Sequence, residues 1–266
     1  MSESPEPPPP LPLLEPATSL LTYVLDERRL ANITERALHL ISQMEWVLPI
    51  VREKVRPDDE KGRNAIESWM EVAATDAPFA NDEYEAGCPK TYAHHLGSLW
   101  GAIESALEQL LVNHLLFVPS AAGLVAVAPR GLARSKIKTG DEDEARATVR
   151  RWGSTLQSPT ALAGHLEILE RFSFRVEAPA DVVRQVNELA ELRNVILHRA
   201  GVVDARFVKK CPGAPWAQGE TVRLNETATR GYFDAAGEFA LALVTAATKS
   251  PHVVAAVRAR GAASKR

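Results

Sequence analysis

Three polar residues near the end of one stretch of the chain have the types and spacing that acid–base chemistry on a phosphodiester requires. The stretch is residues 181–198, and it closes with Arg193, Asn194 and His198. An imidazole titrates near neutral pH, so His198 can move a proton to or from a hydroxyl group. A guanidinium keeps its charge and offers a planar fork of donors, so Arg193 can hold phosphate oxygens. Asn194, four residues before His198, can orient the imidazole or bind a phosphate oxygen.

The same stretch is predicted to be an amphipathic helix that ends near His198. Its apolar face consists of Val183, Val186, Ala190 and Leu197, which recur at helical spacing. Its polar face consists of Asn187, Glu191, Asn194 and His198. Gly201 follows shortly and is a usual helix stop. Five residues of helix rotate by about 140°, so Arg193 and His198 do not share a face. The two side chains must therefore be brought together by the length of the Arg193 side chain, by fraying of the helix end or by a second subunit.

The motif Arg-x4-His, with the polar Asn194 directly after the Arg, resembles the HEPN superfamily of helical domains (higher eukaryotes and prokaryotes nucleotide-binding). Ribonuclease members of that superfamily carry this motif. The flanks are also similar, because a long amphipathic helix precedes the motif and Arg206-Phe207, a short connection and a final long helix follow it. The resemblance covers about residues 90–250 and implies an all-α, HEPN-like helical bundle, with the N-terminal third outside it.

The resemblance implies an activity and partners for the motif. HEPN ribonucleases cleave RNA without a metal through attack by the 2'-hydroxyl, and leave a 2',3'-cyclic phosphate and a 5'-hydroxyl. They are homodimers, so a two-fold packing of the motif helix against its copy is expected. The implied setting is RNA cleavage in prokaryotic stress, phage defence or a toxin–antitoxin pair, restrained by a regulatory protein partner. No cofactor is expected.

Other interpretations of the same residues stay open. Arg193 can instead snorkel or pair with Glu188 or Glu170, and His198 can serve as a favourable cation at a helix C-terminus. The alternative function is a non-catalytic HEPN-like interaction or nucleotide-binding module. The overall acidity and the N-terminal layer favour that alternative. A third interpretation is an unrelated helical scaffold in which the motif arose by chance.

The charge of the chain limits how it could bind RNA. A net charge of -3 is not that of a general nucleic-acid binder, so any contact must be local. Three basic clusters could supply it: Arg130, Arg134, Lys136 and Lys138; Arg146, Arg150 and Arg151; Arg206, Lys209 and Lys210. The last cluster lies just past the motif and is the predicted RNA-binding set. Each cluster could equally be a solvated face.

Several classes of protein are disfavoured by what the sequence lacks. It has no glycine-rich phosphate loop, no Gly-x-Ser-x-Gly and no His-Glu-x-x-His. The two cysteines, Cys88 and Cys211, are predicted to be free thiols, and Cys88 with His94 and His95 makes no recognised zinc spacing. No apolar run is long enough to span a membrane, and the Pro-rich N-terminus is not a signal peptide, which predicts a cytoplasmic protein.

Four regions are predicted in chain order. Residues 1–17 form a disordered, Pro-rich tail. Residues 18–75 form an N-terminal helical layer, with one helix from Thr18 or Ser19 to about Val55 that Pro49 should kink or break, and a second helix after Pro57. The HEPN-like domain spans 90–250, and 251–266 form a basic tail. In the first helix the predicted buried residues are Leu21, Val24, Leu25, Ile33, Ala37, Leu40, Ile41 and Met44, and Trp46, Trp69 and Met70 are also assigned to the core.

Within and between these regions the residue pattern predicts further elements. Residues 76–90 should be a loop, and 92–118 the strongest amphipathic helix, which we expect to pack on the motif helix, with His114 structural. Glu104 and Glu108 on that helix should be solvated or pair with Arg193. The pattern then predicts a basic loop at 119–140, helices at 141–152 and 159–174, and a small β-hairpin that pairs 202–209 with 221–224. A final helix, capped by Asn225, ends at Pro251.

Overall fold

The computed structural model describes residues 12–117, 141–155 and 160–254. Within them the chain forms helices and no strand, so the predicted all-α class is confirmed. The helices are α1 (Glu15–Lys54), α2 (Glu60–Glu85), α3 (Pro89–Phe117), α5 (Glu142–Thr155), α6 (Ala161–Arg171), α7 (Ala180–Arg199), α8 (Ala205–Lys210) and α9 (Glu226–Lys249). Residues 1–11, the whole predicted loop at 119–140 and the residues after 254 lie outside the described part, as do Arg130, Arg134, Lys136 and Lys138.

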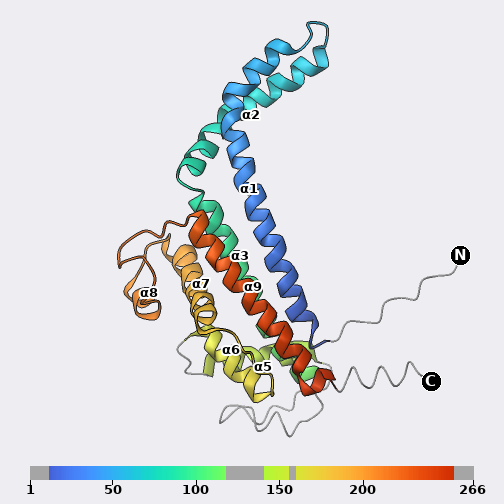
Figure 1. The fold of residues 1–266 in the computed structure, drawn as a ribbon, viewed down its shortest axis with the longest axis vertical. Coiled ribbons are helices and arrows are strands. Elements are labelled where there is room, and N and C mark those ends of the chain that lie inside the picture. The colour runs from blue at the N-terminus through green and yellow to red at the C-terminus, as the bar shows by residue number, and fades with distance from the viewer. Residues whose placement is uncertain (1–11, 118–140, 156–159, 255–266) are drawn as a thin grey trace, which may run out of the picture.

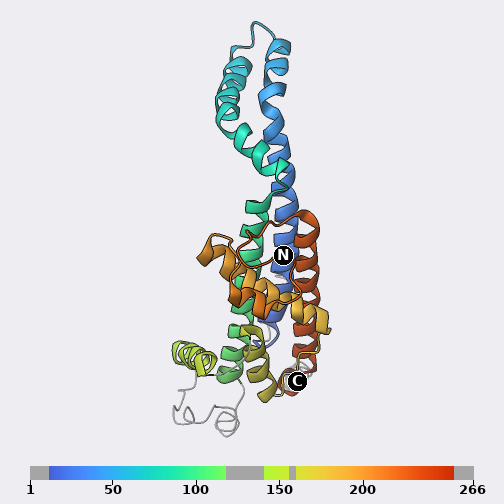
Figure 2. The same cartoon turned by 90° about the vertical axis from the view of Figure 1, so that its left-hand side faces the viewer.

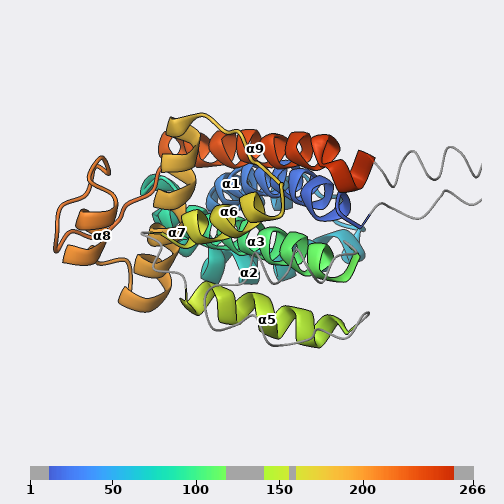
Figure 3. The same ribbon diagram turned by 90° about the horizontal axis from the view of Figure 1, so that it is seen from below.

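Helix α3 is the centre of the bundle. Its side chains at i, i+3, i+4 and i+7 are completely buried, at Leu96, Leu99, Ile103, Leu107, Leu110 and Leu111. Figure 3 shows α9, α1 and α3 running side by side with α5 beyond α3. Helices α1, α3 and α9 contact one another, and α5 contacts α3. The periodicity that predicted the helix therefore also marks the core of the fold.

Helix α7, which carries the motif, packs against both α3 and α9 (Figure 1). Helix α8 follows the C-terminal end of α7 and contacts it. Its buried apolar residues are Val182, Val186, Leu189, Ala190, Leu192 and Val195. The predicted pairing of the motif helix with α3 is confirmed. The helix ends where Ala200 and Gly201 adopt the left-handed conformation at φ 49° and 80°, and the amide of Gly201 donates to the carbonyl of Val195.

Helices α1 and α2 form an antiparallel two-helix arm that extends beyond the bundle (Figures 1 and 2). One prediction fails here, because residues 76–85 are not a loop but the last turns of α2, with Pro78 inside the helix. Of the two effects predicted for Pro49, a break is not observed, since α1 continues past it to Lys54. Ala73, Ala77 and Ala80 continue the helical repeat and are buried. Tertiary packing therefore outweighs the loop propensity of this segment.

The arm also corrects the predicted core. Leu25, Ile33 and Leu40 of α1 are exposed, and so are Trp46 and Trp69. No residue from Asn32 to Val72 is buried. In a two-helix arm each helix has one neighbour, so only one face of each can be covered and the other apolar side chains stay in solvent.

The segment after the motif is not a hairpin. Residues 205–210 form α8, which Asp204 caps by accepting a hydrogen bond from the amide of Phe207 at 2.7 Å. The two predicted strands meet only at one isolated antiparallel bridge, between Val202 and Thr221. The strong cap at Asp204 outweighs the weak alternation that predicted a strand. The predicted cap of α9 is confirmed, because Asn225 Oδ1 accepts from the amide of Ala228 at 2.9 Å.

Cys88 and Cys211 are free, as predicted, and the structure shows that both are buried. His95, which makes no recognised zinc spacing with Cys88, is buried against Glu27, and its Nδ1 lies 2.8 Å from Glu27 Oε1. Among the helices of the described segments, none combines the length and the apolar character that crossing a membrane requires.

His114 is buried in the core, where its Nδ1 donates to the carbonyl of Leu110 at 2.7 Å beside the rings of Phe172 and Phe174. Burial lowers the pKa of this imidazole to about 4. The predicted structural role is confirmed. In the unfolded chain His114 has its ordinary pKa of about 6.5, so it binds a proton below that pH, whereas in the folded chain it stays neutral to lower pH. The folded state is therefore favoured above about pH 6.5 and loses stability as the pH falls below that value.

We therefore predict that lowering the pH from 7 to 5 destabilises the wild type by about 2 kcal/mol more than it destabilises His114→Gln. Urea unfolding of both proteins at the two pH values measures this difference, and titrations common to both proteins cancel. Equal pH dependence of the two proteins would contradict a neutral, buried His114.

Candidate functional site

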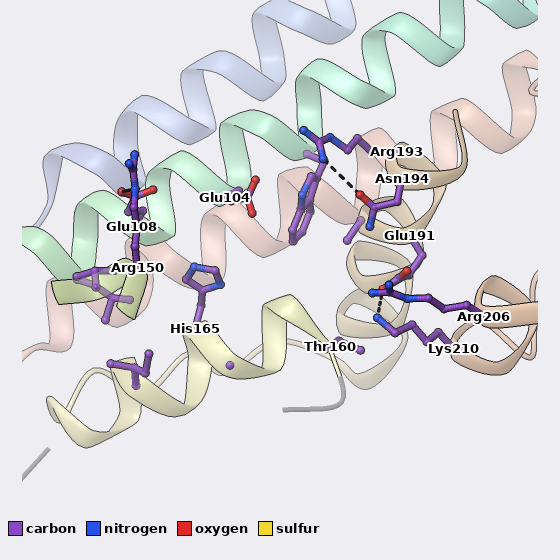
Figure 4. A pocket seen from close by; sticks show the side chains of 16 residues that line it. Glu104, Glu108, Arg150, Thr160, His165, Glu191, Arg193, Asn194, Arg206 and Lys210 are labelled. Atoms are coloured by element: carbon purple, nitrogen blue, oxygen red, sulfur yellow. Dashed lines mark hydrogen bonds and ion pairs between the residues drawn. The ribbon is translucent and has the colours of Figure 1, made fainter. Parts of the chain in front are cut away.

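A cleft of about 460 Å³ lies where α3, α5, α6, α7 and α8 meet (Figure 4). We call it the motif cleft. Its ionisable lining consists of Glu104, Glu108 and Glu191, of Arg150, Arg193, Arg206 and Lys210, and of His165. The cleft thus gathers four cations and three carboxylates from segments that are distant in the sequence.

A second, smaller cavity of about 240 Å³ adjoins the motif cleft and is lined by His198. We call it the His198 groove. The two cavities share Glu191, Asn194 and Arg206, so they are neighbours along α7. His198 is exposed at the last turn of the helix and is therefore accessible to a ligand. Its position beside the C-terminus of α7 also keeps the dipole interpretation open.

The three motif residues are distributed over these two cavities. Arg193 lines the motif cleft, His198 lines the other groove, and Asn194 lines both. Arg193 is half-buried, and its Nη1 donates to Asn194 Oδ1 at 3.3 Å. The separation of Arg193 from His198 follows from their rotation around the helix, as the spacing predicts. Of the three motif residues, only Asn194 lines both cavities of one chain.

The predicted RNA-binding residues divide into two groups. Arg206 is exposed and lines both cavities, whereas Lys209 is exposed and lines neither. Lys210 forms an ion pair with the buried Glu191. The charge of Lys210 is therefore engaged by this carboxylate, a long-range pairing that the sequence does not reveal.

Carboxylates on α3 neutralise part of the second predicted basic cluster. Glu108 Oε1 lies 3.2 Å from Arg150 Nε and 3.4 Å from Arg146 Nη1. Glu108 therefore does not pair with Arg193, contrary to one of the two predictions for it. Glu104 faces the same cleft, in the space between Arg193 and His165 (Figure 4).

The alternative pairing of Arg193 with Glu188 is not observed. Glu188 is buried on the opposite side of α7, where the hydroxyl of Tyr232 donates to it and Arg184 lies 3.6 Å away. Burial and this hydrogen bond raise the pKa of Tyr232 well above its usual range. In the part of the chain that the structure describes, neither Arg193 nor Arg206 forms an ion pair. These two guanidinium groups are the cations that the site leaves free for an anion.

His165 belongs to the site and was missed by reasoning from the sequence. It is half-buried on α6 and lines the motif cleft opposite α7. The sequence carried only a weak signal, a polar residue among the apolar positions Leu162, Leu166 and Leu169. It adds a second imidazole that can bind a ligand or exchange a proton in the cleft.

The arrangement can bind an anion and provides groups that transfer protons. Cys211, which follows α8, is unsuited to nucleophilic chemistry because burial, with the nearby Glu188 and Glu191, raises the pKa of its thiol to about 12. No group of three or more His, Cys, Asp or Glu side chains in the described segments has the arrangement of a metal site. The side chains that the cleft does present are guanidinium, ammonium, imidazole, amide and carboxylate groups.

No family model matches the chain, and no curated protein and no solved structure shows significant similarity to it. The likeness to HEPN domains accordingly stays a prediction that depends on residues 193–198 and their flanks.

We predict that Lys210 is needed for stability. Lys210→Ala leaves Glu191, whose side chain is only 9% exposed, without its cation, and should lower the free energy of unfolding by about 2 kcal/mol. Lys209→Ala, its exposed neighbour, is the matched control and should change stability by less than about 0.5 kcal/mol. Urea unfolding measures both, and equal effects of the two variants would show that the ion pair contributes nothing.

Proposed function

We propose that the protein is a metal-independent endoribonuclease of HEPN type, in which Arg193, Asn194 and His198 act on RNA. One observation carries the proposal: an exposed imidazole and an unpaired guanidinium from a single Arg-x4-His motif open onto adjoining cavities that share Asn194 and Arg206. Accessible residues of these types are what cleavage of a phosphodiester by proton transfer requires.

In the proposed reaction the 2'-hydroxyl oxygen attacks the adjacent phosphorus, and the bond from phosphorus to the 5'-oxygen breaks. His198 takes the proton of the 2'-hydroxyl or gives a proton to the leaving 5'-oxygen. The products are a 2',3'-cyclic phosphate and a 5'-hydroxyl, so atoms balance without another reactant. Arg193 stabilises the charge that develops on the non-bridging oxygens, and Arg206 holds the neighbouring phosphate.

The active unit in this proposal is a homodimer formed through α7. Because one chain places Arg193 and His198 in different cavities, a two-fold axis beside α7 would bring His198 of one copy to Arg193 of the other. The setting would be cytoplasmic RNA cleavage in prokaryotic defence or stress, under a regulatory protein partner.

A non-catalytic nucleotide-binding module is the second candidate, and the carboxylates in the motif cleft favour it. Glu104, Glu108 and Glu191 would repel a run of RNA phosphates. A single nucleotide could instead place its phosphate near Arg193 and Arg206 and donate hydrogen bonds from its base to a carboxylate. The same residues then bind a ligand without cleaving it.

Cleavage of labelled single-stranded RNA in EDTA tests the enzyme. His198→Ala should reduce the rate by about 10²- to 10⁴-fold through loss of proton transfer. Arg193→Ala should reduce it by about 10²- to 10³-fold through loss of charge stabilisation. The controls are His94→Ala and Arg63→Ala, which change an exposed imidazole and an exposed guanidinium outside both cavities.

The product ends and the behaviour of all five proteins decide between the candidates. Cyclic phosphate ends, with activity lost only in the two motif variants, support the ribonuclease. If no protein cleaves RNA but a nucleotide raises the Tm of the wild type and not of Arg193→Ala, the binding module is correct and the ribonuclease is rejected.

A further inference from the structure

The three carboxylates of the motif cleft differ in how far the protein itself occupies them. Glu108 is paired with two arginines, and Glu191 is paired with Lys210. Glu104 has neither an ion pair nor a side-chain hydrogen bond with any residue that the structure describes, although it lines the same cavity. Glu104 is therefore the carboxylate of the cleft that is available to a ligand.

Helix α3 fixes the place of this carboxylate. Four residues of α3 line the cleft, and their spacing of four, four and three puts them on one face of the helix: Trp100, Glu104, Glu108 and Leu111. Glu104 is half-buried, and the neighbouring Ile103 and Leu107 are completely buried in the core. A carboxylate that a rigid, packed helix holds in place can select a ligand by the geometry of its hydrogen bonds.

Groups of the opposite charge stand across the cleft from α3. Arg193 of α7 and Arg206 of α8 form no ion pair with the described residues. Figure 4 shows Glu104 between Arg193 and His165, whereas Arg206 lies on the side of the cleft next to α8. A ligand that crosses the cavity therefore meets guanidinium groups with one part and a carboxylate with another.

The remaining walls and the size of the cleft suit a single flat ring system with one phosphate. The walls include apolar side chains from four helices, Leu111, Val149, Ile168 and Ala190. The volume of about 460 Å³ falls within the range of about 300–1,000 Å³ that small-molecule sites occupy. The cleft therefore has the size for one nucleotide unit.

The four bases of RNA differ in what they offer to one carboxylate, which when ionised only accepts hydrogen bonds. Guanine carries two donors side by side, the N1–H and the N2 amino group, so both oxygens of a carboxylate receive a hydrogen bond. Adenine and cytosine have an acceptor nitrogen beside the amino group, and uracil has one N–H between two carbonyl oxygens. Each of these three bases brings a lone pair against a carboxylate oxygen, which is unfavourable.

We propose that Glu104 recognises guanine, its two carboxylate oxygens accepting from N1–H and the N2 amino group of a guanine nucleotide whose phosphate lies at Arg193 and Arg206. The inference rests on the proposed function in one respect, that a nucleotide occupies the motif cleft, and it applies to both candidates. The ribonuclease would cleave beside a guanosine, and the non-catalytic module would bind a free guanine nucleotide.

Binding of free nucleotides to the full chain tests the proposal. Isothermal titration calorimetry compares guanosine, inosine and adenosine 5'-monophosphates at concentrations up to about 1 mM, which suits weak binding of a single nucleotide. Inosine monophosphate lacks only the N2 amino group of guanine. The guanosine nucleotide should bind about tenfold or more tightly than either of the others, because they leave a carboxylate oxygen without a donor.

Three variants separate recognition of the base from binding of the phosphate. Glu104→Gln keeps the shape of the side chain but replaces one acceptor with a donor, so the preference for guanosine should fall by about tenfold or more. Arg206→Ala should weaken all three nucleotides by the same factor, because they share the phosphate. Glu71→Gln changes an exposed carboxylate of α2 outside both cavities, and this matched control should bind like the wild type.

The comparison of nucleotides in the wild type needs no variant, so a folding defect in Glu104→Gln cannot hide the result. Absence of nucleotide binding, equal binding of the three nucleotides, or a preference that Glu104→Gln retains would overturn the recognition of guanine. Cleavage of RNA is measured separately. Cleavage without preferential binding of guanosine rejects this inference and leaves the ribonuclease, whereas preferential binding that depends on Glu104, without cleavage, supports this inference and rejects the ribonuclease.

Discussion

The rotation of α7 about its own axis is the constraint on which the site depends. Two carboxylates on this helix, Glu188 and Glu191, are buried and need partners, which Tyr232 with Arg184 provides on one side and Lys210 on the other. A rotation of α7 about its axis would separate both carboxylates from their partners and expose the buried leucines of the helix. The polar residues that follow Glu191 are thereby held towards the cavities, and Arg193 and His198 are held on different sides of the helix end.

This constraint also decides which cations the site can use. A buried carboxylate attracts a neighbouring cation strongly, so Lys210 is bound to Glu191 and is unavailable to a ligand in this conformation. Glu108 has the same effect on Arg150. Arg193 and Arg206 differ because no carboxylate in the described segments lies within ion-pair distance of them. The anion-binding capacity of the cleft is therefore smaller than its number of basic residues indicates.

The sequence predicted those parts of the structure that local signals determine. The apolar repeat of α3, the cap of α9 by Asn225 and the rotation between Arg193 and His198 depend only on spacing and residue type, and the structure agrees with each. The exposure of Trp69 could not be predicted, because a helical repeat does not reveal how many neighbours a helix has. The pairing of Lys210 with Glu191 likewise required α8 to fold back onto α7, which residues 202–209 did not indicate.

The arm and the bundle differ in how much burial supports their helices. Ordering a helix costs conformational entropy at every residue, and in globular proteins that cost is offset mainly by burying an apolar face. The bundle achieves this around α3, where six side chains are completely buried. In the arm no residue from Asn32 to Val72 is buried in one chain, although both helices continue without a break. The arm therefore depends mainly on the contacts between α1 and α2 alone, which leave most of its side chains partly or fully in solvent.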